Sequence, residues 1–176
     1  MARQQKIEKA DVAAVEAPRK SLFDRVAGFL DANDWNYRAE PEKGFFDMRV
    51  SIKYATARVI LDADEREDWQ RVTAYAVYPV VAPENRRTAV LEAINRINYS
   101  LAYGNLEMDG SDGEIRLRAV IEADAEMSET LMERVLHGSL TLASRYFAPL
   151  MSVAFGNTDP ATVLDLVADN DKQTLQ

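Results

Sequence analysis

The sequence predicts an α+β fold in which helices pack against an antiparallel sheet. Alternating apolar and polar residues, clearest at Phe46–Lys53, are typical of a half-buried strand. Apolar residues at helical spacing, as at Leu22–Leu30, predict amphipathic helices before and after the strands. Turns of hairpin length join most strands, which favours antiparallel pairing. The expected order of elements is therefore α-β-β-β-(β)-α-β-β-α, with the helices against one face of the sheet.

The first half of the chain supplies one helix and most of the strands. Ser21 is a suitable N-cap for the first helix, which we expect to end near Asn33. A short strand at Trp35–Arg38 and a turn containing Pro41 and Gly44 follow. The next predicted segments are the strands 46–53, 56–61 and Trp69–Val81, with a charged loop at Asp62–Asp68 between the last two.

The second half alternates a helix, a hairpin and a longer helix. Pro83 is suited to the start of the second helix, which Gly104 ends. The segment Asp109–Gly113 predicts a hairpin turn between two strands. The third helix begins after Ser128, and we expect Pro149 to kink it. The predicted organisation is an N-terminal arm at 1–19, one α+β domain at 20–157 and a C-terminal segment at 158–176. This last segment consists of a short helix, which ends near Val167, and a flexible tail.

Composition excludes several classes of function. The 176 residues fit one domain, and a hydrophobic content of 47% is enough to form a core. A formal net charge of -8 disfavours nucleic acid and anionic membrane surfaces as partners and favours basic ones. The sequence has no cysteine, which excludes disulfides and thiolate chemistry. The N-terminal residues lack the apolar stretch of a signal peptide, and no apolar run is long enough for a membrane span, so we expect a soluble, cytoplasmic protein.

No motif for catalysis, a cofactor or a metal ion is recognisable. His137 is the only histidine, and the long helix around it offers only Glu133 as a partner one turn away. The turn that starts at Asp109 resembles a calcium loop, but Gly113 and Glu114 stand where an oxygen ligand and a glycine are required. The sequence has no Gly-rich phosphate loop and no HExxH or GxSxG motif. We therefore expect a protein that is not an enzyme, although paired carboxylates leave a hydrolase as a weaker alternative.

The strand predicted at Trp69–Val81 is apolar on both faces. Val72, Ala74 and Ala76 lie on one face, whereas Tyr75 and Val77 lie on the other. A strand of this kind needs cover on both sides of the sheet. Four candidates could cover the second face of this strand: a second subunit, a partner segment, the N-terminal arm or the chain's own helices.

The helix and hairpin between residues 94 and 118 resemble the YbjN family of "Putative bacterial sensory transduction regulator" proteins. The residues that carry the resemblance are Ile94-Asn95-Arg96-Ile97-Asn98, Gly104-Asn105-Leu106-Glu107-Met108-Asp109 and Asp112-Gly113-Glu114-Ile115-Arg116-Leu117-Arg118, followed by the long helix with Pro149. The resemblance covers most of the chain from Ser21 to Gly156. It implies a fold like that of type III secretion chaperones, usually paired into a dimer, and it supplies no catalytic residues.

Two functional hypotheses follow from these observations. The first is a protein-binding module, a regulator or chaperone-like adaptor that acts as a homodimer and uses an apolar surface. The residues predicted to form that surface are Trp69, Tyr75, Val77 and Tyr78. The second hypothesis is a small-molecule or metal sensor that uses the acidic segment Asp62–Asp68.

Overall fold

Six strands form one antiparallel sheet in a computed structural model that describes residues 20–124 and 126–174. The strand order in the sheet is β1-β2-β3-β4-β6-β5. The strands are β1 (Tyr37–Glu40), β2 (Phe45–Ile52), β3 (Ala55–Glu65), β4 (Gln70–Val81), β5 (Asn105–Met108) and β6 (Glu114–Ala123). The described residues thus confirm the predicted α+β class, including the strand that the sequence left optional.

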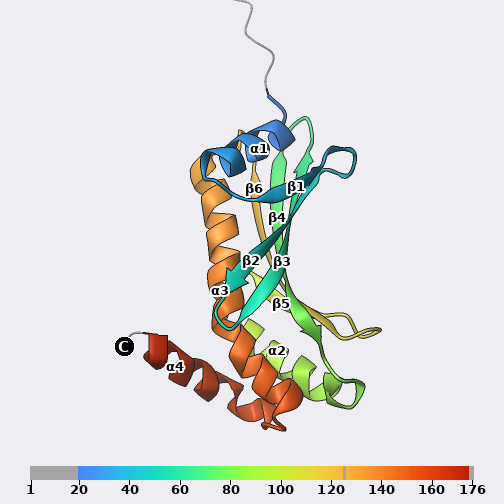
Figure 1. Ribbon diagram of the computed structural model, residues 1–176, viewed down its shortest axis with the longest axis vertical. Helices are drawn as coiled ribbons and strands as arrows, with labels where there is room; N and C mark the ends of the chain where they lie inside the picture. Colours follow the sequence, from blue (N-terminus) through green and yellow to red (C-terminus); the bar gives the residue numbers. More distant parts are fainter. Residues whose placement is uncertain (1–19, 125, 175–176) are drawn as a thin grey trace, which may run out of the picture.

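Four helices complete the fold (Figure 1). They are α1 (Leu22–Ala32), α2 (Arg87–Ser100), α3 (Glu129–Phe155) and α4 (Val163–Thr174). Ser21 caps α1 by accepting a hydrogen bond from the backbone N–H of Asp24, and Ser128 caps α3 in the same way through Leu131. Figure 1 shows α3 along the sheet, α1 across its upper end, and α2 and α4 together at the lower end.

The core lies between the sheet and the pair of helices α1 and α3. One row of facing residues crosses four strands, from Phe46 to Leu61, Ala74 and Ala119, and all four side chains are buried. The ring of Phe23 in α1 stacks on Phe46 with 4.3 Å between ring centroids. Because the residues of this row on β4 and β6 are alanines, the 27-residue helix α3 can pack closely over these two strands.

The predicted loop at Asp62–Asp68 is wrong at its start. Strand β3 continues to Glu65, and only the residues after it form the turn to β4. The strand continues because Asp62 and Asp64 pair with Thr73 and Arg71 in the register of β3 and β4. Charge along a chain does not mark a loop when every second side chain points to solvent.

The last helix also extends beyond its prediction. It continues to Thr174 instead of ending near Val167, because contacts with the rest of the fold hold its second half. Lys53 donates a hydrogen bond to Asn170 at 3.0 Å, and Arg145 forms an ion pair with Asp171 at 2.7 Å. The predicted N-terminal arm at 1–19 and the end of the predicted tail lie outside the described residues.

Pro149 lies inside α3, which stays a helix on both sides of it. A proline has no N–H, so the carbonyl of Arg145 four residues earlier loses its helical partner. The side-chain amide of Asn170 in α4 donates to that carbonyl at 3.1 Å. The C-terminal helix thus satisfies the backbone group that the proline leaves open.

Candidate functional site

The face of the sheet opposite α1 and α3 has no helix over it among the described residues (Figure 1). We call it the helix-free face. Tyr75 and Val77 lie at its centre on β4, and both are only half-buried. Their neighbours Ala74 and Ala76 point to the helices and are fully buried. The strand is therefore apolar on both faces, and the chain's own described helices cover only one of them.

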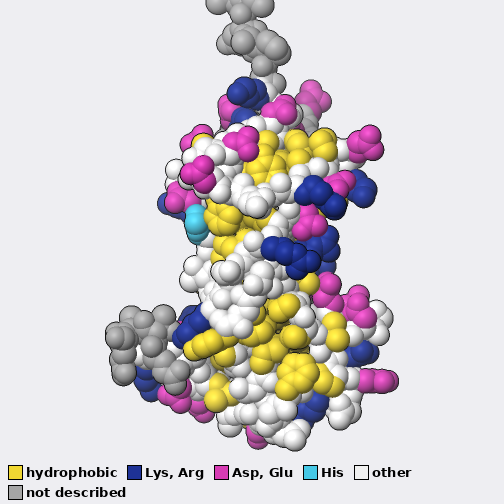
Figure 2. All heavy atoms as spheres, in the orientation of Figure 1, with side chains coloured by type: hydrophobic (Ala, Val, Ile, Leu, Met, Phe, Trp, Pro, Cys, Tyr) yellow, Lys and Arg dark blue, Asp and Glu magenta, His cyan; other side chains and the backbone are white. Residues whose placement is uncertain are grey.

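Arginines surround these two residues on the neighbouring strands. Val77 faces Arg58 of β3 and Arg116 of β6, and Tyr75 faces Arg118. Arg49 of β2 continues the row beside Arg58. Figure 2 shows basic side chains gathered at mid-height on the sheet side of the molecule, although the whole chain is acidic.

Two carboxylates neutralise part of this charge. Asp47 accepts hydrogen bonds from Arg58, the shortest at 2.8 Å, and lies 4.0 Å from Arg38. The hydrogen bond from Arg58 lowers the pKa of Asp47, although burial opposes the shift. Arg49 makes no ion pair with any residue that the structure describes.

Glu107 plays the corresponding role on the other side of Tyr75. Burial alone would raise the pKa of Glu107, but hydrogen bonds from Asn105 and Arg116 outweigh it and lower the pKa. Glu107 lies 2.8 Å from Arg116 and 3.4 Å from Arg118. The guanidinium of Arg116 also lies over the ring of Tyr75, 4.7 Å from its centroid. The aromatic side chain is thus held in place with one side of its ring against an arginine.

A groove opens at the lower end of the helix-free face. Its volume is about 550 Å³, and its lining includes Arg49, Arg58, Val77, Val81 and Phe155. Regular pairing of β4 with β6 breaks between Val77 and Val81, and the break contains Pro79, which has no N–H to donate. The side chains of Val81 and Phe155 are 54% and 55% exposed, so the groove presents apolar surface to solvent beside two arginines.

The upper end of the same face is acidic. Asp62 and Asp64 of β3 lie there, with Glu122 of β6, and Arg71 lies between them. Arg66 forms a further ion pair with Asp64 at 3.7 Å. Burial and the neighbouring Asp64 raise the pKa of Asp62. The helix-free face therefore carries arginines beside its centre and carboxylates at its upper end.

The four residues predicted to form a binding surface do not lie together. Tyr75 and Val77 are neighbours on the helix-free face. Trp69 precedes β4, roughly 20 Å along the strand from Tyr75, and its ring lies 5.0 Å from the guanidinium of Arg71.

The prediction that Tyr78 belongs to this surface is wrong, because its side chain points to the helices. It is 3% exposed, and its hydroxyl donates to the carbonyl of Ala143 at 3.0 Å. Burial raises the pKa of this hydroxyl strongly. Its place follows from the two-residue period of a strand, which puts Tyr78 and Val77 on opposite faces.

The other candidates for chemistry are engaged in the fold. Glu65 accepts a hydrogen bond from the side chain of Gln70 and another from the backbone of Leu22, and Asp64 pairs with Arg71. Asp109 accepts hydrogen bonds from Ser111, as the predicted hairpin turn requires. Among the described residues, no group of three His, Cys, Asp or Glu is placed to hold a metal ion. His137 is exposed on α3, with its ring 5.6 Å from that of Trp35.

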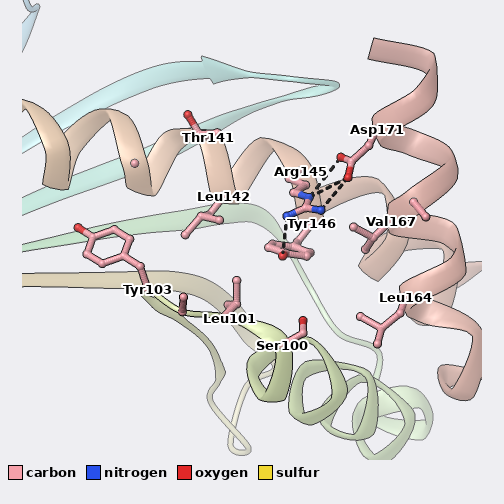
Figure 3. Close-up of a pocket in the computed structure, with 13 residues that line it drawn as sticks. Ser100, Leu101, Tyr103, Thr141, Leu142, Arg145, Tyr146, Leu164, Val167 and Asp171 are labelled. Carbon is pink, nitrogen blue, oxygen red and sulfur yellow. Dashed lines mark hydrogen bonds and ion pairs between the residues drawn. The ribbon is translucent and has the colours of Figure 1, made fainter. Parts of the chain in front are cut away.

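A second concavity, of about 660 Å³, lies where α2, α3 and α4 meet. Figure 3 shows Leu142 of α3 above Leu101, with Leu164 and Val167 projecting from α4 toward the same space. The ion pair between Arg145 and Asp171 lies at its edge, and Arg145 also donates to the Tyr146 hydroxyl at 3.3 Å. The dashed lines in this view join Arg145 to Asp171 and to Tyr146, so these three side chains have partners within the protein.

The YbjN family model, described as "Putative bacterial sensory transduction regulator", matches residues 22–151. The chain belongs to the YbjN family. This confirms the resemblance inferred from the helix and hairpin between residues 94 and 118. The match begins with α1, includes all six strands, and ends inside α3, so it leaves α4 outside. The candidate site on the helix-free face lies within the family region, except for Phe155.

Comparison with curated proteins finds no match. Among solved structures, a chain from the HopA1–SchA chaperone–effector complex is similar, with 17% sequence identity and a TM-score of 0.45. The similarity covers 70% of this chain and 91% of that chain. No helix in the described part of the chain is long and apolar enough to cross a membrane.

The sequence did not identify the groove. The alternation at Phe46–Lys53 puts Arg49 on the polar side of its strand, but it does not show which residues of other strands lie beside it. Which residues face one another depends on the register between strands, and a single strand does not reveal that register. Nothing in the sequence indicates that Phe155 lines the same groove as Val81.

Proposed function

We propose that this YbjN protein is a non-enzymatic protein-binding module, a regulator or chaperone-like adaptor that acts as a homodimer and binds through the helix-free face. The observation that carries the proposal is the half-buried pair Tyr75 and Val77 at the centre of a sheet face that no described helix covers. The proposed binding domain is residues 20–157, and the proposed location is the cytoplasm.

The composition of the face supports a protein as the partner. Tyrosine and arginine are the residues that most often dominate the binding energy of protein interfaces, where they sit near the centre of the contact. Here Arg116 already lies over Tyr75, so little side-chain freedom is lost when a partner covers the ring. A second copy of the chain and a different polypeptide both fit this surface, and the experiment separates them.

The test compares two substitutions on the face with one elsewhere. Tyr75→Asp and Val77→Asp each place a charge at the centre of the proposed contact, and we expect each to weaken self-association or partner binding at least about tenfold. Tyr99→Asp is the control, because Tyr99 is 94% exposed on α2. Binding is measured by analytical ultracentrifugation for self-association and by titration against any co-purified polypeptide.

Circular dichroism shows whether the variants keep their fold. A folded Tyr75→Asp or Val77→Asp protein that retains its oligomeric state and all its partners would refute the proposed surface. If Tyr99→Asp has the larger effect, the contact lies at the helical end of the molecule instead.

A further inference from the structure

The groove at the lower end of the helix-free face combines exposed apolar side chains with two arginines that face each other. Val81 and Phe155 present more than half of their surface to solvent. Arg49 and Arg58 stand directly opposite each other on β2 and β3. Like charges at facing positions of neighbouring strands destabilise a sheet. A bound partner that supplies negative charge would offset this repulsion between the two arginines.

Only one of the two arginines forms an ion pair within the described chain, although the charge of Arg49 also acts on Asp47. Asp47 is engaged with Arg58 and lies near Arg38, whereas Arg49 has no ion pair. The hydrogen bond to Asp47 is the main cause that raises the pKa of Arg58, and the charge of Glu114, which also lines the groove, adds to it. At the upper end of the face, Asp62, Asp64 and Glu122 outnumber the two arginines paired with them, so a long polyanion lying along the whole face would be repelled there. The groove therefore favours a short anionic group accompanied by apolar surface.

An extended acidic polypeptide meets both requirements. In a strand, side chains at i and i+2 point the same way and lie roughly 6.8 Å apart. Because Arg49, Val81 and Phe155 all line the groove, a segment that carries a carboxylate two residues from an apolar side chain can present both to it. Arginine binds carboxylates through two parallel hydrogen bonds, which gives such a contact direction as well as strength.

We propose that the groove lined by Arg49, Arg58, Val81 and Phe155 binds an extended acidic segment of a partner protein, in which acidic and apolar residues stand two positions apart and so point to the same side. The proposal rests on the proposed function, because it names the partner chemistry at one end of the helix-free face. It reverses the expectation from the net charge of -8 that partners would be basic.

The probe, called the Glu–Val peptide, is a fluorescein-labelled peptide with the ten-residue sequence Glu-Ser-Val-Ser-Glu-Ser-Val-Ser-Glu-Ser, so that Glu and Val follow each other on one side of the strand. It is titrated with the full chain and followed by fluorescence anisotropy. We expect it to bind more weakly as salt is added, because the contact is partly ionic. Matched peptides with Gln or Lys in place of Glu should bind at least about tenfold more weakly, and a ten-nucleotide oligothymidine should not compete.

The protein variants are Arg49→Glu and Arg58→Glu, with Arg134→Glu as the control on the exposed side of α3. Each groove variant should weaken binding of the Glu–Val peptide at least about tenfold, and the control should leave it unchanged. Arg49→Gln removes the charge without reversing it and should give a smaller loss. Circular dichroism confirms that each variant is folded.

The inference is overturned if the Glu–Val peptide fails to bind, if the Gln or Lys peptide binds equally well, or if the oligonucleotide binds more tightly. Its failure is distinct from failure of the proposed function. If a partner loses binding with Val77→Asp but keeps it with both arginine substitutions, the protein-binding role stands. Only the proposal of an acidic segment is then contradicted.

Discussion

At the scale of single residues, two glycines in the turn between β5 and β6 differ in what a side chain would meet. A Cβ on Gly113 would lie 2.5 Å from the carbonyl oxygen of Ala82, and its φ is +85°. Gly110 has nothing within 4 Å of such a Cβ and no positive φ. We expect Gly113→Ala to lower the free energy of unfolding by about 2 kcal/mol or more, through clash and backbone strain.

Gly110→Ala is the matched substitution in the same turn, and we expect it to change stability by less than about 0.5 kcal/mol. Urea denaturation of both variants is the measurement. Equal losses at the two positions would show that the turn, rather than the contact with Ala82, sets the effect.

The pair Asp47 and Arg58 makes stability depend on pH. Because the hydrogen bond from Arg58 lowers the pKa of Asp47 in the folded protein, the pair stabilises the fold above the unfolded pKa. This stabilisation is lost as the pH falls through the lower, folded pKa. We expect Asp47→Asn to cost about 1 kcal/mol or less at pH 6, since Arg58 is half exposed, and less still at pH 3.

Urea denaturation of the wild type and Asp47→Asn at both pH values is the test. A difference that stays constant or grows toward pH 3 would mean that Asp47 is not stabilised as a carboxylate. The same substitution should strengthen binding of the Glu–Val peptide, because it removes a negative charge beside the groove, so stability and binding should change in opposite directions.

At the scale of elements, local patterns predict most of the fold. Alternation places Phe46, Met48 and Ile52 on the core side of β2, and Ser21 and Ser128 begin the helices as expected. The predictions that failed are the extents of β3 and α4. Both elements extend because of partners in a neighbouring element, Arg71 of β4 for Asp64 and Arg145 of α3 for Asp171. Such contacts leave no signal in the local pattern.

The contact between α3 and α4 gives a prediction for a pair of substitutions. Asn170 donates to the Arg145 carbonyl that Pro149 leaves without a helical partner. We expect Asn170→Ala to cost about 1 kcal/mol in the wild type, and clearly less in a Pro149→Ala background, where the restored N–H supplies the bond.

A double-mutant cycle of unfolding free energies measures this coupling. Asp169→Ala is the control, because its described ion pair is with Lys172 in the same helix. If Asn170→Ala lowers the free energy of unfolding equally in both backgrounds, the Asn170 amide does not replace the N–H that Pro149 lacks.

At the scale of the whole molecule, net charge and local charge point to different partners. The net charge of -8 predicts basic partners, yet strand register gathers Arg49, Arg58, Arg116 and Arg118 around Tyr75 and Val77. The sequence identified the central strand and its two apolar faces. It did not predict that Tyr78 is buried, and it did not predict which residues form the groove. The position of Tyr78 and the lining of the groove both depend on pairing and packing across the sheet.

The central claim is that the helix-free face contacts a protein, and photo-crosslinking in living host cells tests it most directly. A photoreactive amino acid is placed at Val77, and at Arg134 on α3 as the control. We predict a light-dependent cross-linked product from position 77 and none from position 134, with mass spectrometry showing a second copy of the chain or another polypeptide. No product from position 77, or equal products from both positions, would contradict the claim.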